Sequence, residues 1–355
     1  MARRAKQAKR NGADAARIDA MLDLGVRDIW YPVMPSWAVS TAPVGITRLG
    51  ERLVAWRDRT GTVRLLEDRC PHRGSRLSLG WNRGDRLACW YHGLQVGTDG
   101  TVLRVPAVPS CVLEGTRTLR TYETREAAGA IFAYFGAKPG TKAPPLVLPE
   151  QLTAPQYDNF LSAAHWRCSY RYVMDNNVDP VHGIYLHRYS HSMTEGTDEA
   201  KMHVRPTKTG FVFEKLNQRD VNLDWSEFGD TNLHWIRAIT PYQKYAGPGG
   251  VFWIIGSWVP VDANNCVVFF WRVRKVEGWM RASWRFLYKM RLEGLHWDVL
   301  EQDRAMLENF PRDARQHEFL YEHDVGLARM RRHLERKAAA QLAGSRSKKA
   351  RPAAR

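Results

Sequence analysis

Two cysteines and two histidines with matched spacing form the strongest chemical signal in this sequence. Cys70-Pro-His72 is followed, after sixteen intervening residues, by Cys89-Trp-Tyr-His92. Each segment offers one thiolate and one imidazole, so two facing loop tips could bind a metal centre with mixed sulfur and nitrogen ligands. A two-iron, two-sulfide cluster with two Cys on one iron and two His on the other has this donor set, and it transfers electrons. The motif therefore predicts that the function of the chain begins with electron transfer.

A structural zinc site is the alternative for the same four residues. Zinc fingers usually place both cysteines in one knuckle and both histidines in the other. Here each knuckle holds one of each, so each iron of a cluster can draw one ligand type from both loops. Gly74 and Gly93 follow the two pairs and provide flexible backbone whose N–H groups could bond the cluster sulfides. We therefore favour the cluster over zinc.

A second group of residues could bind a single metal ion. His182 and His187 are five residues apart, which is not one face of an ideal helix, but a bend near Gly183 would bring both imidazoles to one ion. With one carboxylate they would form the two-His-one-carboxylate triad of non-haem iron oxygenases, which leaves coordination positions open. Asp179 lies three residues before His182, and its ordinary role would be that of a helix N-cap.

The elements that must position these residues fall into two parts. Residues 29–135 show short alternating strands and turns, and both Cys/His pairs lie between such strands. The Pro- and Gly-rich segment 137–149 is the best linker candidate. Beyond it, residues 170–187 are expected to form an irregular or broken helix, residues 203–276 read as strands, and helical periodicity begins near residue 279. The expected fold class is α+β: an all-β domain, then a domain whose antiparallel β-sheet is flanked by helices.

The two short motifs resemble those of a known family. Cys-Pro-His-Arg-Gly at 70–74 and Cys-Trp-Tyr-His-Gly at 89–93 resemble the Rieske domain of bacterial Rieske non-haem iron oxygenases. The segment Asp-Asn-Asn-Val-Asp-Pro-Val-His-Gly-Ile-Tyr-Leu-His at 175–187 is similar to a signature of the same family, and the resemblance covers roughly residues 28–310. It implies a terminal oxygenase (alpha) component with a Rieske [2Fe–2S] cluster and a mononuclear Fe(II). The implied ligands are Cys70, His72, Cys89 and His92 for the cluster, and His182 and His187 for the single iron.

The resemblance also implies roles for two acidic residues. In the family, the counterpart of Asp179 is not a metal ligand but bridges the Rieske His of one subunit to an iron-binding His of the next. The stretch 297–308 looks like the late helix that carries the third iron ligand, and Asp303 is our choice, with Asp298 and Glu301 as rivals. Asn176, like its neighbour at 177, either lines the active site or caps a helix.

The implied reaction inserts oxygen from O2 into a small organic substrate, expected to be aromatic, by hydroxylation or cis-dihydroxylation. O- or N-demethylation by a monooxygenase of the same family is the alternative, and a Rieske-type electron carrier is the non-enzyme alternative. Since no strand is followed by Gly-x-Gly-x-x-Gly, a separate reductase, a ferredoxin or both must deliver electrons from NAD(P)H. The family implies a homotrimer.

Large aromatic residues on the strands expected over residues 203–276 either contact the substrate or belong to the hydrophobic core: Trp235, Phe252, Trp253, Trp258 and Phe269.

The positive charge of the chain is concentrated at its ends. The formal net charge is +16, of which residues 1–17 carry +5 and residues 331–355 carry +8, leaving only +3 for the body. Solvated tails explain this distribution better than a nucleic-acid surface does, and no apolar run approaches the ~20 residues of a membrane span. We therefore expect no nucleic-acid and no membrane partner, and five cysteines without a disulfide framework favour the cytoplasm.

The expected segments are a basic, partly disordered N-terminal segment over residues 1–27, a Rieske domain over 28–145, a catalytic domain over 146–335 and a basic tail over 336–355.

Overall fold

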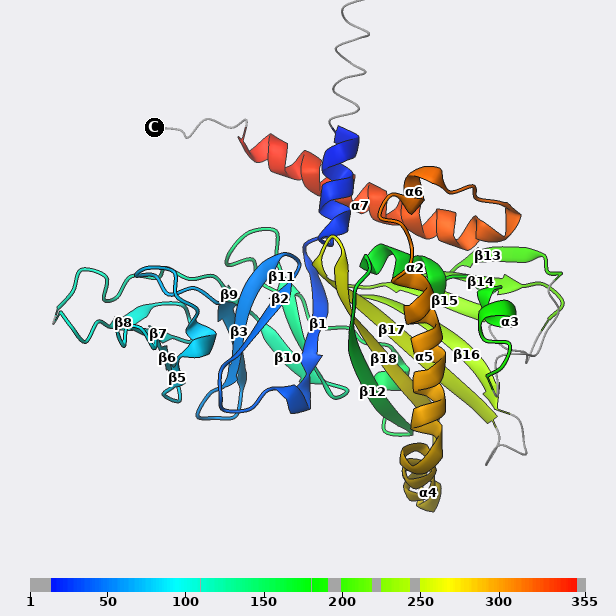
Figure 1. Ribbon diagram of the computed structural model, residues 1–355, viewed down its shortest axis with the longest axis horizontal. Helices are drawn as coiled ribbons and strands as arrows, with labels where there is room; N and C mark the ends of the chain where they lie inside the picture. Colours follow the sequence, from blue (N-terminus) through cyan, green and yellow to red (C-terminus); the bar gives the residue numbers. More distant parts are fainter. Residues whose placement is uncertain are drawn as a thin grey trace, which may run out of the picture.

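The N-terminal half of the protein consists of short antiparallel strands, as the sequence predicts. The structure is a computed structural model that describes residues 14–108, 110–179, 181–190, 199–218, 225–242 and 250–349. The first eleven strands are β1 (Ile29–Pro35), β2 (Val44–Arg48), β3 (Glu51–Arg57), β4 (Val63–Glu67), β5 (Trp81–Asn82), β6 (Arg86–Ala88), β7 (Gln95–Gly97), β8 (Val102–Arg104), β9 (Thr121–Tyr122), β10 (Thr124–Ala127) and β11 (Ala130–Phe135). They form three sheets, with strand orders β2-β3-β4-β9, β5-β6-β7-β8 and β1-β11-β10 (Figure 1).

The β3–β4 hairpin shows how local chemistry fixes these strands. Asp58 accepts hydrogen bonds from the backbone N–H groups of Thr60 and Thr62 at 2.9 and 3.0 Å, which closes the turn between these strands. Gly61 has φ +82°, a conformation that favours glycine. The turn sets the register in which Val54 faces Leu66, and both side chains enter a small core beneath the two Cys/His loops.

The C-terminal half is built on one seven-stranded antiparallel sheet. Its strands are β12 (Tyr157–Trp166), β13 (Met202–Pro206), β14 (Gly210–Lys215), β15 (Trp225–Asp230), β16 (His234–Tyr242), β17 (Gly250–Asp262) and β18 (Asn265–Lys275), in the order β12-β18-β17-β16-β15-β14-β13. One face of the sheet packs on the N-terminal β-domain, where Trp271 stacks on Phe132 at 6.1 Å and donates to the carbonyl of Ala128 at 2.7 Å. The opposite face carries helices.

The helices cover the face that holds the candidate site. They are α2 (Tyr170–Asn177), α3 (His182–Leu186), α4 (Trp279–Leu287), α5 (Glu293–Leu307), α6 (Ala314–His317) and α7 (Val325–Lys349), and a π-helical segment, Tyr288–Leu292, joins α4 to α5. Helix α2 contacts β17, β18 and α5. The expected irregular helix over residues 170–187 is confirmed as two helices separated by a break. The predicted fold class is therefore confirmed.

Both charged ends of the chain contain helical structure that packs on the body. A helix over residues 14–23 crosses α7 (Figure 1), and the Gln341 side chain exchanges hydrogen bonds with the backbone of Arg27 at 2.6 and 3.0 Å. Ala338 is fully buried. The expected boundary between residues 335 and 336 falls inside α7, which continues through it as one helix.

The expected linker has no regular structure but is tied to the body. Within residues 137–149, the carbonyl of Pro144 accepts from the Trp30 indole N–H at 2.9 Å, and the N–H of Val147 donates to Asn232 at 3.2 Å.

None of the described helices is both long and apolar enough to cross a bilayer. None of the five cysteines, all of which the structure describes, forms a disulfide bond.

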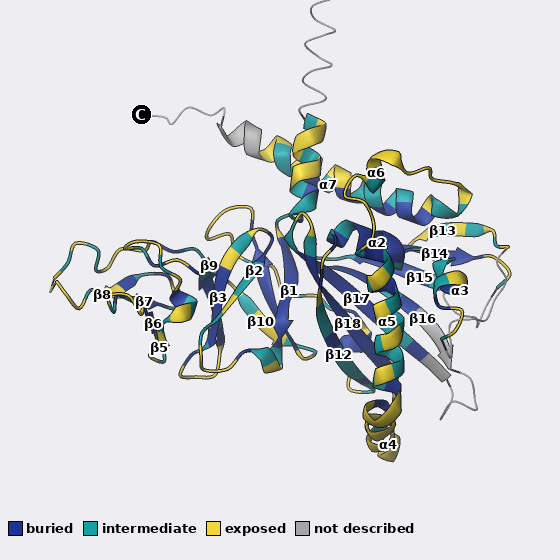
Figure 2. Cartoon of the chain, in the orientation of Figure 1, coloured by how far each residue is buried: buried dark blue, intermediate teal, exposed yellow. Residues whose placement is uncertain are grey.

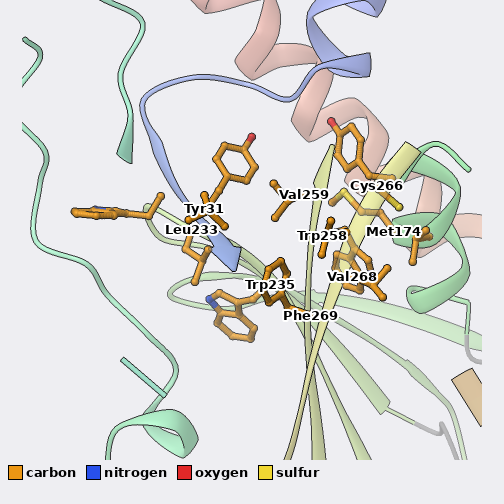
Figure 3. Close-up of a cluster of buried hydrophobic side chains, with 14 of the residues drawn as sticks. Tyr31, Met174, Leu233, Trp235, Trp258, Val259, Cys266, Val268 and Phe269 are labelled. Atoms are coloured by element: carbon orange, nitrogen blue, oxygen red, sulfur yellow. The ribbon is translucent and has the colours of Figure 1, made fainter. Parts of the chain in front are cut away.

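Most of the aromatic residues proposed as substrate contacts belong to the core. Trp235, Trp258 and Phe269 lie in the main buried cluster between α2, the sheet and β1 (Figure 3), and Phe252 lies in a second buried cluster beneath α4. Figure 2 shows this burial extending along the sheet strands, whereas α4 is largely exposed. Trp253 is half-buried and packs edge-on against Tyr157. The plain-core interpretation therefore accounts for these residues.

Candidate metal centres

The two Cys/His loops have the same backbone geometry. In the first loop the Cys70 carbonyl accepts from the N–H of Gly74 at 3.0 Å, and in the second the Cys89 carbonyl accepts from the N–H of Gly93 at 2.8 Å. Both glycines have positive φ, +78° and +72°, so the turn requires glycine in each loop. The two tips face each other, because the His72 and His92 Nδ1 atoms are 3.1 Å apart.

The donor atoms of these loops suit an iron–sulfur cluster. Both cysteine thiols are buried above the small β-domain core, while His72 and His92 are exposed at the tips. Burial and the neighbouring Cys89 thiol raise the pKa of Cys70, although backbone N–H groups of His72 and Arg73 act in the opposite direction. A thiolate at Cys70 therefore requires a cationic centre beside it. Buried sulfur on one side and exposed imidazole on the other match a cluster whose two irons carry different ligands.

The second site begins at the break between α2 and α3. The Asp179 carboxylate accepts from the backbone N–H groups of Val181 at 2.7 Å and His182 at 3.4 Å, although the N-cap residue of α3 is Val181 and not Asp179. Helix α3 ends one residue before His187. The short helix brings the His182 and His187 rings to a centroid separation of 5.2 Å, which is the convergence that a bend was expected to produce.

Asp303 completes this site from α5. Its Oδ1 lies 3.3 Å from His187 Nε2 and 3.7 Å from His182 Nε2, and one ligand atom from each of the three residues lies within 4.8 Å of the others. Asp303 is buried, whereas Asp298 is exposed and Glu301 is paired on the outer face of the helix with Arg304 at 3.3 Å. The structure thus places Asp303, and neither rival, with the two histidines. Two imidazoles and one carboxylate form the donor set that binds ferrous iron with positions left open.

A layer of hydrogen bonds fixes the orientation of these three side chains. His182 Nδ1 lies 2.5 Å from the Asp179 carbonyl oxygen, and His187 Nδ1 lies 2.9 Å from Gln302 Oε1. Both partners are acceptors, so each ring carries its proton on Nδ1 and turns the Nε2 lone pair toward Asp303. The Asn176 amide donates to Asp303 Oδ1 at 3.0 Å. Gln302 was not among the residues singled out from the sequence; its only sequence signal is its place directly before Asp303.

Asp303 raises the pKa of the neighbouring His187. Burial alone would lower the pKa of His187, but the hydrogen bond and charge of Asp303, together with the Gln302 side chain, raise it above its usual value. The neutral ring is the form that binds a metal. Metal binding at this site should therefore weaken as the pH falls.

The two sites are far apart within one chain. The Cys/His loops belong to the part of the β-domain that carries β5–β8, whereas α3 lies at the opposite end of the molecule (Figure 1). Asp179 is half-buried, and its second carboxylate oxygen accepts no hydrogen bond from any residue that the structure describes. One chain thus presents an exposed imidazole pair at one end and a partly open carboxylate beside the three-residue site at the other.

A β-domain with paired Cys/His loops, joined to a helix-covered antiparallel sheet with a two-His-one-carboxylate site, defines a two-centre, iron-dependent redox protein. Comparison with known proteins gives the family. Residues 29–123 match the Rieske [2Fe-2S] domain, and residues 166–340 match the vanillate O-demethylase oxygenase C-terminal domain. The chain belongs to the Rieske non-haem iron oxygenases, whose cofactors are a [2Fe–2S] cluster and a mononuclear iron.

Individual relatives carry different named activities. The chain is 29% identical over 272 residues to the tert-butanol monooxygenase / tert-amyl alcohol desaturase oxygenase subunit of Aquincola tertiaricarbonis, covering 70% of this chain and 56% of that protein. It is 32% identical over 181 residues to the vanillate O-demethylase oxygenase subunit of Pseudomonas sp. (strain HR199 / DSM 7063), covering 50% and 49%. The chain therefore spans about half the length of these curated relatives.

Solved structures share the fold over nearly the whole chain. Dicamba monooxygenase bound to dicamba superposes with a TM-score of 0.72 at 20% identity, covering 90% of this chain and 99% of that one. The terminal oxygenase of carbazole 1,9a-dioxygenase from Nocardioides aromaticivorans IC177 also gives a TM-score of 0.72, at 18% identity, covering 91% and 96%. At these identities the likeness shows the fold.

Proposed function

We propose that the chain is a terminal oxygenase component that incorporates oxygen from O2 into a small organic, aromatic substrate. In this proposal Cys70, His72, Cys89 and His92 hold the Rieske cluster, and His182, His187 and Asp303 hold the mononuclear iron. When bound, the cluster supplies single electrons and the ferrous iron binds and activates O2. The observation that carries the proposal is the convergence of His182, His187 and Asp303 in a chain that also has the paired Cys/His loops.

The chain's own residues set the geometry for both centres. Asp179 and Gln302 hold the Nδ1 atoms of the two histidines, and Asn176 holds Asp303, so three ligand atoms face one point without further rearrangement. Such preorganisation keeps the remaining side of the metal site available for substrate and O2. The partial burial of His182, against the near-complete burial of His187, indicates which side is open.

We further propose that the functional unit is a homotrimer in which electrons cross between subunits. The large separation of the two sites within one chain supports transfer to a neighbour (Figure 1). The exposed His72 and His92 rings and the open oxygen of Asp179 are complementary, since an imidazole N–H from one subunit can donate to the carboxylate of the next. Asp179 then acts in two ways, as an acceptor for backbone N–H groups at the start of α3 and as the link between the centres.

The electron donor in this proposal is a separate reductase, a ferredoxin or both. Solved structures similar in fold to this chain include complexes between oxygenase and ferredoxin of carbazole 1,9a-dioxygenase. The surface beside the cluster loops is hollowed and lined by Arg73, Trp90 and Tyr91, with Arg73 over the Tyr91 ring at 5.6 Å. A basic and aromatic surface next to the cluster suits an acidic donor protein.

Oxidative demethylation is the second candidate reaction. The matched C-terminal domain is that of vanillate O-demethylase, and relatives include vanillate O-demethylase oxygenase subunits and the oxygenase component of a chloroacetanilide N-alkylformylase. Under this alternative the same sites act on a methyl ether or N-alkyl group instead of a ring carbon. Product analysis with isotopically labelled O2 separates the two: label in a ring hydroxyl supports hydroxylation, and release of formaldehyde from a methyl ether supports demethylation.

Substitution of Asp303 tests the proposed function against the electron-carrier alternative. Asp303→Ala should keep the cluster but lose the mononuclear iron and all product formation, because a buried ligand is removed from a three-residue site. Glu301→Ala, on the outer face of the same helix, is the matched control and should retain both. An Asp303→Ala protein that still binds stoichiometric mononuclear iron would overturn the ligand assignment.

A further inference from the structure

Helix α4 and the π-helical segment that follows it expose large apolar side chains on their outer face. Trp279, Phe286 and Met290 are 79%, 64% and 71% exposed. Residues seven apart lie on nearly the same face of a helix and residues four apart are neighbours, so these three side chains form one stripe, the α4 stripe. Trp284 and Tyr288 lie on the opposite face and are buried against the sheet. A contiguous stripe of exposed apolar side chains indicates an interaction site.

The α4 stripe lies where a broad partner can reach it. In Figure 1, α4 extends beyond the lower ends of the neighbouring sheet strands, and Figure 2 shows that most of its surface is exposed. Met280 and Leu287 are also exposed and widen the apolar surface on one side. The helix continues through the π-helical segment into α5, so the stripe and the proposed iron ligand Asp303 belong to one continuous helical stretch.

Basic residues border the α4 stripe on both sides. By helical position, Arg285 and Lys289 lie along one border and Arg291 along the other, and all three are exposed. Arg285 and Lys289 each pair with an acid, at 2.8 and 2.7 Å, but ion pairs this exposed contribute little and leave the positive charge accessible. Residues 275–293 contain five basic and two acidic residues, a net charge of +3, which Asp158 beside Arg285 reduces to +2. The border of the stripe is therefore positively charged.

An apolar stripe with basic borders fits an anionic lipid surface better than it fits a second protein. Helices that lie in a membrane surface carry aromatic and aliphatic side chains on one face and Lys or Arg beside them, whose long side chains reach the lipid phosphates. Protein interfaces instead need a hydrogen bond about every 100–200 Å². Within α4, all of which the structure describes, Ser283 is the one uncharged polar side chain on the exposed face. The outer face of α4 thus offers a protein partner few hydrogen bonds.

We propose that the α4 stripe binds the surface of an anionic lipid bilayer. Its three side chains enter the boundary between headgroups and acyl chains, while the bordering basic residues contact the phosphates. The expectation of no membrane partner rests on the absence of a spanning segment, and a helix that lies along the surface needs none. Lipid binding by α4 does not depend on the proposed oxygenase reaction, but it brings the helical stretch that carries Asp303 next to a phase that dissolves apolar substrates.

Co-flotation of the whole, iron-loaded protein with lipid vesicles tests the proposal without turnover. The probes are vesicles of phosphatidylcholine alone and vesicles of phosphatidylcholine mixed with phosphatidylglycerol. The wild type should bind the anionic vesicles about 10-fold or more tightly than the neutral ones. A triple variant, Trp279→Ser with Phe286→Ser and Met290→Ser, should bind the anionic vesicles about 10-fold or more weakly than the wild type, because it loses apolar burial in the bilayer. Trp37→Ser is the matched control and should bind as the wild type does, since Trp37 is equally exposed but lies in the β-domain.

The basic ends of the chain are the main competing explanation, because they also attract anionic lipids. Binding that survives in the triple variant assigns the vesicle binding to those ends and overturns the proposal, as does a wild type that binds no vesicles. Analytical ultracentrifugation separates the remaining alternative: a triple variant with fewer subunits than the wild type shows that a second copy of the chain covers the stripe, which also overturns the proposal. Lost vesicle binding with unchanged subunit number and iron content supports it.

The test also distinguishes failure of the proposed function. A wild-type protein that binds vesicles but holds no mononuclear iron contradicts the oxygenase proposal and leaves the lipid-binding proposal standing. Every replaced side chain is exposed, so the triple variant should fold as the wild type does. If it does not, the single variants Trp279→Ser and Phe286→Ser take its place, and each must weaken vesicle binding severalfold.

Discussion

The hydrogen bond between Gln302 and His187 should control how tightly the mononuclear metal binds. His187 is almost fully buried, and its Nδ1–H has the Gln302 Oε1 atom as its partner at 2.9 Å. Gln302→Leu removes that acceptor with little change in volume. The ring then loses both its orientation and the fixed proton position that directs the Nε2 lone pair toward the metal.

The size of the effect follows from the burial of the ring. Leaving a buried donor unsatisfied costs about 1–3 kcal/mol, and removing an outer hydrogen-bond partner of a metal-binding histidine typically weakens metal affinity about 10- to 100-fold. The two estimates agree, because a tenfold change in affinity corresponds to about 1.4 kcal/mol. We therefore expect Gln302→Leu to bind Fe(II) about 10- to 100-fold more weakly than the wild type.

Anaerobic titration with Fe(II) against a competing chelator measures this change, and the visible absorbance of the cluster serves as an internal control. Gln302→Glu retains an acceptor for His187 and should bind at least as tightly as the wild type. Glu301→Leu, one residue earlier on the outer face of α5, controls for a general effect on the helix. Wild-type affinity in Gln302→Leu, or an equal loss in Glu301→Leu, would refute the reasoning.

Two further substitutions test the link between the centres and the attachment of α7. Asp179→Asn should keep both metal centres but lose most turnover, because an amide is a weaker acceptor for a neighbouring subunit's imidazole; near-normal activity in a metal-replete variant would exclude the bridging role. Asp230 is bonded by His333 and Lys337 of α7, so Asp230→Asn should lower the free energy of unfolding by about 2 kcal/mol near neutral pH. Although burial opposes ionisation, hydrogen bonds from His234 and His333 and the charge of Lys337 hold the pKa of Asp230 well below its usual range. This stabilisation is present above the ordinary carboxyl pKa and is lost as the pH falls toward the lowered pKa of Asp230, so the difference between wild type and Asp230→Asn should begin to shrink below about pH 4 and keep shrinking at lower pH. Urea unfolding across that range measures it, and a difference that stays constant with pH would contradict the ion-pair assignment.

Local patterns made much of the architecture predictable. Short alternating strands, the Asp58–Gly61 turn and the break between α2 and α3 all follow from nearby residues, and the structure has them. The basic ends were harder to interpret. Their composition suggests solvated tails, but Ala338 is fully buried and Gln341 bonds to Arg27, 314 positions away, and composition does not record such contacts.

The site residues that lie in short motifs were predictable from the sequence, whereas those whose partners are distant in sequence were not. The Cys/His loops and the His182–His187 segment are short motifs whose spacing specifies their chemistry. Three acids on one helix, Asp298, Glu301 and Asp303, were candidates for the third ligand. Only the folded structure shows that Asp303 is buried and that the other two are exposed. Gln302 acts through its contact with His187, 115 positions away in the sequence, so no local pattern distinguishes it from an ordinary helix residue.

Determination of iron, zinc and acid-labile sulfide in the purified protein tests the central claim most directly. The account predicts three irons and two sulfides per chain, two irons and both sulfides in the Rieske cluster and one iron with His182, His187 and Asp303. Two irons and two sulfides with no third metal would support an electron carrier instead. Zinc without sulfide would contradict both the cluster and the oxygenase function.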